Sequence, residues 1–275
     1  MFERSRLEQV LGNYPSVLVG YSGGVDSALV AVVARRVLGR DRAVAAMGVS
    51  ASLPRTQREQ ALAIARRFDL DLIEVTTDEL RDPNYVANSP DRCYYCKSEL
   101  WAKLSATARE RGMEIVADGT NLDDLGEHRP GLRAQKQWKV RSPLVEAGYT
   151  KEDVREEARR LEIPIWDAPA APCLSSRIMY GLSVTGERLR QVERGEEFLR
   201  SLGVKGDLRV RHRGSEARIE VAPSEFDLVR RHAGTIGKAL LDLGFERVTL
   251  DLRGYRRGSF LAGESAQLEL LAERS

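Results

Sequence analysis

A run of small residues near the start of the chain has the composition of a phosphate-binding loop. Residues 22–27 read Ser-Gly-Gly-Val-Asp-Ser, between an apolar run at 16–20, predicted as a buried strand, and a helix predicted over 27–38. Glycines permit close backbone approach, serines add hydroxyl groups, and the helix start directs N–H groups and a positive dipole end at an anion. Asp26 is predicted to cap this helix or to help hold a magnesium ion. The loop matches neither the Walker nor the dinucleotide fingerprint, and its alternative is a turn without a ligand.

Three cysteines offer a second kind of chemistry. Cys93 and Cys96 form a C-x-x-C pair, which suits zinc, iron–sulfur or redox chemistry, or else two half-buried thiols at a helix start. Cys173 stands in a proline-rich stretch, 168–177, that is predicted to be a loop presenting the thiol; the alternative is a buried cysteine in a linker. The histidines lack ligand spacing, so nothing favours zinc over an iron–sulfur site. Three thiolates would leave one iron of a [4Fe–4S] cluster open, provided that Cys173 comes near the pair.

Arginines at alternate positions mark a third candidate site. Arg209, Arg211 and Arg213 would point to one face of a predicted strand. Like charges on one face repel one another unless acids or an anion neutralise them, and arginine suits bidentate recognition of a phosphate. A solvated edge strand guarded by charge explains the same pattern equally well.

The elements that would position these residues follow two patterns. Strands alternate with helices up to about residue 180, which predicts an α/β fold with a doubly wound parallel sheet. Beyond residue 186 the strands are paired, which predicts a small α+β domain. We place the boundary between 180 and 187, giving domains of 1–185 and 186–275. The predicted strands are 16–20, 43–50, 72–76, 114–117, 208–213, 217–221 and 247–252, and the further helices are 55–68, 95–111, 150–161, 187–202 and 224–243.

The net charge and the apolar stretches of the chain limit the kinds of partner that we expect. The 275 residues carry a net charge of only +2, which disfavours a nucleic-acid partner. There is no apolar stretch of bilayer length, and the chain starts with polar residues, so we expect a cytoplasmic protein without a membrane partner.

The loop at 22–27 resembles the signature of the PP-loop ATP pyrophosphatases. Members of this superfamily split ATP between the α and β phosphates and attach AMP to a substrate oxygen, so the resemblance implies ATP and magnesium. It also implies that the segment at 47–52 holds the adenine and that Asp26 takes part in catalysis. The residues expected to bind ATP are Gly20, Tyr21, Ser22, Gly23, Gly24, Asp26, Ser27, Val49 and Gly119.

A closer resemblance covers most of the chain, from about residue 10 to 255. Residues 172–177 (Pro-Cys-Leu-Ser-Ser-Arg), 129–132 (Arg-Pro-Gly-Leu) and 140–144 (Val-Arg-Ser-Pro-Leu), together with the loop, are similar to the LarE family of sulfur transferases. These homo-oligomeric enzymes adenylylate a carboxylate of a pyridinium dicarboxylate mononucleotide and replace its oxygen with sulfur, on the way to the nickel-pincer nucleotide. The resemblance implies that Arg177, Arg209, Arg211 and Glu197 bind the substrate phosphate.

The source of the sulfur separates two branches of that family. In one branch the cysteine matching Cys173 gives up its own sulfur and becomes dehydroalanine. In the other, three cysteines carry a [4Fe–4S] cluster that passes on a sulfide from an external donor. Because Cys93 and Cys96 accompany Cys173, we expect the cluster branch, with Cys173 as both catalytic residue and cluster ligand.

Three other functions fit part of the pattern. A PP-loop tRNA thiolase also uses three cysteines, but it predicts a basic, extended surface. An amide-forming PP-loop synthetase needs an ammonia source, and no glutaminase-like segment is visible. A nucleotide-sensing module leaves Cys173 and the arginine strand without a purpose.

Overall fold

The structure is a computed structural model that describes residues 5–126, 130–169, 172–256 and 267–271. It divides into a first unit, Met1–Asp82 with Asp91–Pro172, and a second unit, Pro83–Pro90 with Cys173–Ser275. The boundary at 185/186 therefore stays a prediction. Arg129 and residues 170–171, which belong to segments singled out in the sequence, lie outside the described residues.

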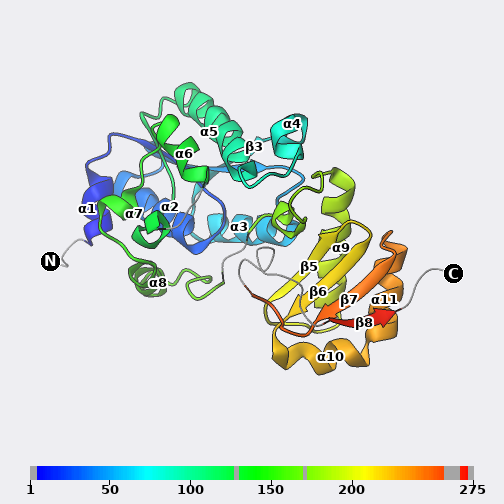
Figure 1. Ribbon diagram of the computed structural model, residues 1–275. Coiled ribbons are helices and arrows are strands. Elements are labelled where there is room, and N and C mark those ends of the chain that lie inside the picture. The colour runs from blue at the N-terminus through cyan, green and yellow to red at the C-terminus, as the bar shows by residue number, and fades with distance from the viewer. Residues whose placement is uncertain (1–4, 127–129, 170–171, 257–266, 272–275) are drawn as a thin grey trace. The chain divides into compact units, whose positions relative to one another are not determined.

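The sheet of the first unit has four parallel strands (Figure 1). Their order is β3-β2-β1-β4, with every neighbouring pair parallel, so the α/β prediction is confirmed. Strands β1, β2 and β3 follow one another in one direction across the sheet, whereas β4 lies on the other side of β1. This change in strand order is the switch point of the sheet, and ligands of such sheets bind there, at the carboxyl ends of the strands. The strands are β1 (Val17–Gly20), β2 (Ala43–Val49), β3 (Asp71–Thr76) and β4 (Ile115–Ala117).

Helices cover both faces of this sheet. Alternation along β1 sends Val17 and Val19 into the larger core and Leu18 into the smaller one, where it meets Trp101. The larger core involves α1 (Arg6–Gly12), α2 (Val25–Leu38), α3 (Arg55–Arg67), α7 (Pro143–Glu146) and α8 (Lys151–Arg160). The smaller core involves α5 (Arg92–Glu110) and α6 (Pro130–Gln137). The short helices η1 (Glu79–Arg81) and η2 (Leu122–Gly126) complete the unit.

The second unit has a sheet in the order β5-β6-β7-β8, with the outer pairs antiparallel and β6 parallel to β7. One face packs Val210, Ile219 and Leu250 with Leu199 and Leu240 of the helices. The strands are β5 (Leu208–Arg213), β6 (Glu216–Val221), β7 (Arg247–Asp251) and β8 (Gln267–Leu271), of which β8 was not predicted. The helices are α4 (Pro83–Val86), η3 (Leu174–Arg177), α9 (Gly186–Ser201), η4 (Pro223–Glu225), α10 (Phe226–Arg231) and α11 (Ala233–Asp242).

Residues 83–90 belong with the second unit although they precede the first unit's α5. The buried side-chain amide of Asn88 donates to the carbonyls of Met179 and Leu182, both at 2.9 Å. The Tyr85 hydroxyl lies 2.5 Å from that of Ser175 in η3. These bonds fix the turn that carries Cys173.

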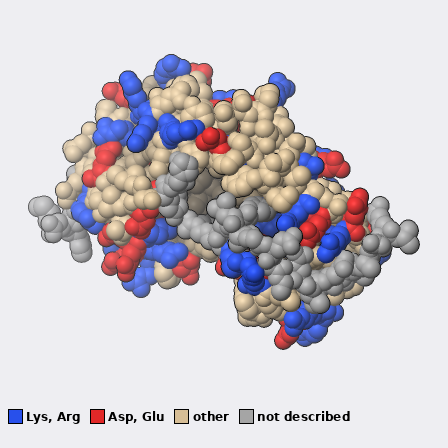
Figure 2. All heavy atoms as spheres, in the orientation of Figure 1, with Lys and Arg blue, Asp and Glu red and all other residues tan. Residues whose placement is uncertain are grey.

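Acidic and basic side chains are interspersed on the face shown in Figure 2. This mixture fits the small net charge. Within the described ranges, no helix is both long and apolar enough to cross a bilayer.

Candidate active site

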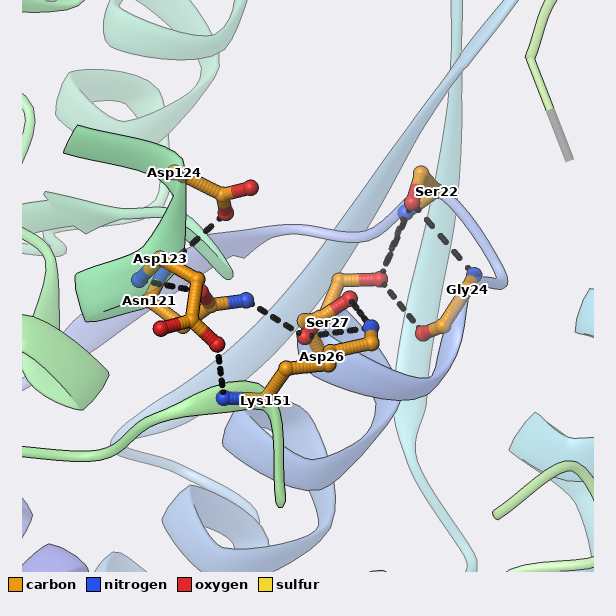
Figure 3. Close-up of polar contacts among 8 residues, drawn as sticks. All are labelled: Ser22, Gly24, Asp26, Ser27, Asn121, Asp123, Asp124 and Lys151. Atoms are coloured by element: carbon orange, nitrogen blue, oxygen red, sulfur yellow. Dashed lines mark hydrogen bonds and ion pairs between the residues drawn. The ribbon is translucent and has the colours of Figure 1, made fainter. Parts of the chain in front are cut away.

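The glycine loop connects β1 to α2 at the switch point of the first sheet. Gly23 has a φ of +76°, and a Cβ at this position would lie 2.7 Å from the Cβ of Ala61, so only glycine fits. The Ser27 hydroxyl accepts a bond from the Ser22 backbone N–H at 3.1 Å and donates to the Gly24 carbonyl at 3.1 Å (Figure 3). The turn is therefore closed by its own serines, with the start of a 14-residue helix behind it.

Asp26 does not cap α2. The N-cap is Gly24, with no side-chain cap bond, and Asp26 is the second helical residue. Its carboxylate accepts a bond from the side-chain amide of Asn121 at 3.0 Å and from the Lys151 ammonium group at 2.6 and 2.8 Å (Figure 3). A carboxylate held at the end of this loop, in the first turn of α2, retains the ability to bind a metal ion, which was the other predicted role.

Gly119 follows β4 and passes directly against the start of α2. A Cβ on Gly119 would lie 2.5 Å from the backbone nitrogen of Ser27 and 2.9 Å from the backbone carbonyl carbon of Asp26. Next to it, burial raises the pKa of Asp118, whose carboxylate accepts bonds from the hydroxyls of Thr120 at 2.6 Å and Ser142 at 2.9 Å. The switch point thus brings the loop after β4 against the glycine loop.

Replacing Gly119 by alanine is expected to lower kcat/KM for ATP by about 10- to 100-fold, because backbone atoms cannot yield and the start of α2 must move. Substrate-dependent pyrophosphate release against ATP concentration measures it. The matched control is Gly234→Ala, since a Cβ there meets nothing within 4 Å. Equal kinetics for the two variants would contradict the tight contact.

The other residues predicted to bind ATP lie at the ends of β1 and β2. A Cβ on Gly20 would approach the Trp101 ring to 2.7 Å, and the buried Tyr21 donates its hydroxyl to the Ala61 carbonyl at 3.0 Å, so a nucleotide could meet only their backbone.

At the end of β2, the Val49 carbonyl accepts a bond from the Thr77 N–H at 3.0 Å. Just beyond it, the hydroxyls of Ser50 and Ser52 both donate to Glu79, which is 3 % exposed and was not predicted from the sequence. This network holds the segment expected to receive the adenine.

Cys93 and Cys96 lie on the first turns of α5, which begins three residues earlier than predicted. Their spacing places both thiols on one face of the helix. Cys93 is exposed and Cys96 half-buried, and none of the three cysteines, all within the described residues, forms a disulfide. No group of three or more His, Cys, Asp or Glu side chains arranged for a metal ion occurs among the described residues. Cys96 and Cys93 belong to the first unit and Cys173 to the second, so the three-cysteine cluster stays a prediction.

Cys173 precedes the η3 turn with its thiol exposed. The sulfur lies 3.7 Å from the Ser175 hydroxyl. The Cys173 backbone carbonyl accepts bonds from the Ser176 hydroxyl at 2.7 Å and from the Arg177 guanidinium group at 2.9 Å. The backbone that carries the thiol is therefore tied to Arg177.

Arg177, Arg209 and Arg211 form a buried cluster in the second unit. Arg177 pairs with both oxygens of Glu196 at 3.0 and 3.1 Å, and Arg211 pairs with Glu220 at 2.9 Å and donates to the Ser176 carbonyl at 3.0 Å. Burial, and then the neighbouring charge of Arg177, lower the pKa of Arg209, whose guanidinium group lies over the Tyr255 ring. Three guanidinium groups thus lie together with the carboxylates of Glu196 and Glu220.

Two further residues, Arg213 and Glu197, were also singled out from the sequence. Arg213, at the end of β5, is paired with Glu216 at 3.5 Å and is only partly buried. Glu197 was expected to serve the substrate phosphate; its neighbour Glu196 bonds Arg177 and the Val210 N–H. The role of Glu197 stays a prediction.

The sequence shows similarity to several known proteins. Residues 5–118 match the NAD synthase family. A pyridinium-3,5-bisthiocarboxylic acid mononucleotide synthase of Lactiplantibacillus plantarum is 35% identical over 93% of this chain and 92% of its own length. An uncharacterised protein of Synechocystis is 44% identical over 92% of the chain and 94% of its own length. A glutamine-hydrolysing GMP synthase of Ligilactobacillus salivarius is 27% identical over 71% of the chain and 40% of its own length.

Proposed function

The chain belongs to the LarE family of PP-loop ATP pyrophosphatases, and we propose that it converts a carboxylate of a pyridinium-3,5-dicarboxylate mononucleotide into a thiocarboxylate for nickel-pincer nucleotide synthesis. The L. plantarum relative is named for a product that is a bisthiocarboxylic acid mononucleotide, and this name supports the substrate class. The same proposal includes a homo-oligomer in the cytoplasm.

One observation in the second unit carries the proposal. The exposed Cys173 thiol and the arginine cluster share the η3 turn, since Arg177 donates to the Cys173 carbonyl at 2.9 Å and Arg211 to the Ser176 carbonyl at 3.0 Å. Three guanidinium groups gathered in this way suit a mononucleotide phosphate, because arginine recognises phosphate oxygens in a bidentate manner. A sulfur atom would then stand beside the bound substrate.

The reaction has two stages. A substrate carboxylate oxygen attacks the α-phosphorus of ATP, the bond between that phosphorus and the bridging oxygen breaks, and pyrophosphate leaves. Sulfur then bonds the acyl carbon and AMP departs, because AMP is a better leaving group than oxide. The N–H groups at the start of α2 would hold the pyrophosphate, and the arginine cluster would fix the substrate phosphate. Magnesium, held by Asp26, would neutralise charge on the phosphates.

Two sources of sulfur fit the chain. Three cysteines without disulfides, two of them on one helix face, suit a [4Fe–4S] cluster, which would supply a sulfide bound at an open iron position. In the alternative, the Cys173 sulfur bonds the acyl carbon itself. Loss of the Cys173 Cα proton and cleavage of its Cβ–S bond then leave dehydroalanine in the chain and the thiocarboxylate on the product.

The test supplies ATP, magnesium and the pyridinium dicarboxylate mononucleotide to anaerobically reconstituted protein. We expect pyrophosphate and AMP to appear only with substrate, and product mass to change by exchange of one oxygen for one sulfur. The dephosphorylated nucleoside is the control and should react poorly, because it lacks the group for the arginine cluster. Absence of substrate-dependent pyrophosphate release overturns the proposal.

The sulfur source is decided by two measurements on the same protein. Iron and sulfide counts with an absorbance spectrum test the cluster, and a colourless, iron-free protein after reconstitution would exclude it. Mass spectrometry after turnover tests the alternative, since a Cys173 that has lost one hydrogen sulfide identifies the sacrificial route.

A further inference from the structure

A glutamine of α3 bonds the backbone of the glycine loop. The side-chain amide of Gln57 donates to the Ser22 backbone carbonyl at 2.9 Å, 35 residues away along the chain. The same helix meets the loop region at two further points, since the Tyr21 hydroxyl donates to the Ala61 carbonyl and a Cβ on Gly23 would lie 2.7 Å from that of Ala61. Gln57 and Ala61 stand one turn apart, so one face of α3 forms a wall of the loop.

The amide of Gln57 has no task within its own helix. Gln57 is the third residue of α3, whose N-cap is Pro54. A glutamine at the third position commonly turns back and bonds the N–H of the N-cap residue, and proline has no such N–H. The amide is therefore available to bond outside α3, and the partner that it finds is the glycine loop.

The bond to Ser22 leaves the other half of the amide unpaired. The Gln57 Oε1 atom is buried and has no hydrogen-bond partner among the residues that the structure describes. Turning the amide over would set this oxygen against the Ser22 carbonyl oxygen, so the orientation is fixed by the bond. A buried acceptor without a partner destabilises a fold, and an apolar side chain of similar size would avoid that cost. Stability of the fold therefore does not account for an amide at this position.

The bond fixes the direction of the peptide group between Ser22 and Gly23. In a trans peptide the carbonyl oxygen and the N–H point in opposite directions. Because the Ser22 carbonyl is held towards α3, the Gly23 N–H points away from that helix. Within the described part of the chain this N–H donates to no other atom, whereas the Ser22 N–H is already taken by the Ser27 hydroxyl at 3.1 Å (Figure 3). A free backbone donor is thus held in a set direction just before the start of α2.

Building on the ATP-dependent step of the proposed function, we propose that Gln57 is a positioning residue for ATP. It holds the Ser22–Gly23 peptide so that the Gly23 N–H donates to an oxygen of the pyrophosphate moiety. A donor aimed in advance needs no reorganisation when negative charge builds on the departing pyrophosphate. Without the amide bond the peptide can turn, because glycine at position 23 resists rotation little. Gln57 acts through the loop backbone and does not touch the nucleotide.

Gln57→Leu is expected to weaken ATP binding without weakening the fold. The affinity for magnesium ATP should fall about tenfold by calorimetry, the scale of a lost hydrogen bond to a charged group. AMP lacks the pyrophosphate moiety, so its affinity should stay unchanged. The thermal unfolding midpoint should stay equal or rise, because leucine removes the unpaired buried acceptor. Gln57→Met, which is unbranched like glutamine, should behave in the same way.

The matched control is Gln60→Leu, an exposed glutamine on the same helix. It should change neither affinity. Unchanged ATP affinity in the Gln57 variants, or an equal loss of ATP and AMP affinity, overturns the positioning role. A lowered unfolding midpoint with unchanged ATP affinity would make Gln57 a residue of the fold alone. Because these titrations need no mononucleotide, they decide the role of Gln57 even if the proposed substrate fails to react.

Discussion

Cys173→Ser is expected to abolish thiocarboxylate formation while substrate-dependent pyrophosphate release continues. Serine cannot carry sulfur or bind an iron ion as a thiolate does, whereas the proposed adenylylation would use the glycine loop, which belongs to the first unit. Loss of a reacting group costs about 1000-fold or more in rate. The Cys173 side chain is exposed, so the exchange should cost the fold only about 0.5 kcal/mol. Mass spectrometry of the product and a pyrophosphate assay on one sample separate the two stages.

Cys93→Ser is the companion variant because it removes a thiol of the first unit without touching the η3 turn. With the cluster route it should lose iron and repeated turnover. With the sacrificial route it should match the wild type, giving one product per chain. Thiocarboxylate formed by Cys173→Ser at a normal rate would contradict a role for Cys173 under either route.

The first unit could be predicted well because its signals are local. Strands buried on both faces of a parallel sheet are apolar runs, and residues 43–49 form such a run next to a helix of buried alanine, valine and leucine. The start of α8 at Thr150 was equally readable, since Thr150 and Asp153 form the capping box that the sequence suggests. Each of these patterns lies within a few residues, where hydrogen bonding and side-chain periodicity decide the structure.

What could not be predicted depends on contacts between distant segments. Residues 83–90 pack with the second unit through Asn88 and Tyr85, which no local pattern reports. The helix expected over 224–243 is interrupted at His232, where α10 ends and α11 begins. The placement of residues 83–90 comes from tertiary packing rather than from local propensity.

The candidate site shows the same division. The glycine loop was visible because strand, glycines and helix are consecutive, but Lys151 reaches it across 125 residues. The only unusual feature of Lys151 in the sequence is its position at the predicted start of a helix, where the helix dipole favours acidic residues. Glu196, which bonds Arg177, was not predicted, because only the contact across the fold distinguishes it from the other acidic residues of α9.

Asp26→Asn is expected to lower the rate of pyrophosphate release by about 100-fold or more, the scale of a lost electrostatic contact in a transition state. The substitution keeps the shape and an oxygen that accepts the Asn121 amide bond, but it removes the charge that pairs with Lys151 and that, in the proposed function, would hold a magnesium ion. The ion pair itself is partly exposed, so its loss should cost the fold only about 0–1 kcal/mol. Steady-state rates at saturating ATP, together with a thermal unfolding midpoint, separate catalysis from stability.

The matched control for Asp26→Asn is Asp69→Asn, in the same unit. Asp69 pairs with Arg35 and Arg40 at the surface, and these arginines hold its pKa below the usual range, so the control also removes a paired carboxylate. Because Asp69 is apart from the glycine loop, its variant should keep the wild-type rate. If both variants slow the reaction equally, the loss reports a general effect of charge. If Asp26→Asn stays within about tenfold of the wild type, too little free energy is lost for Asp26 to hold the metal ion during adenylylation.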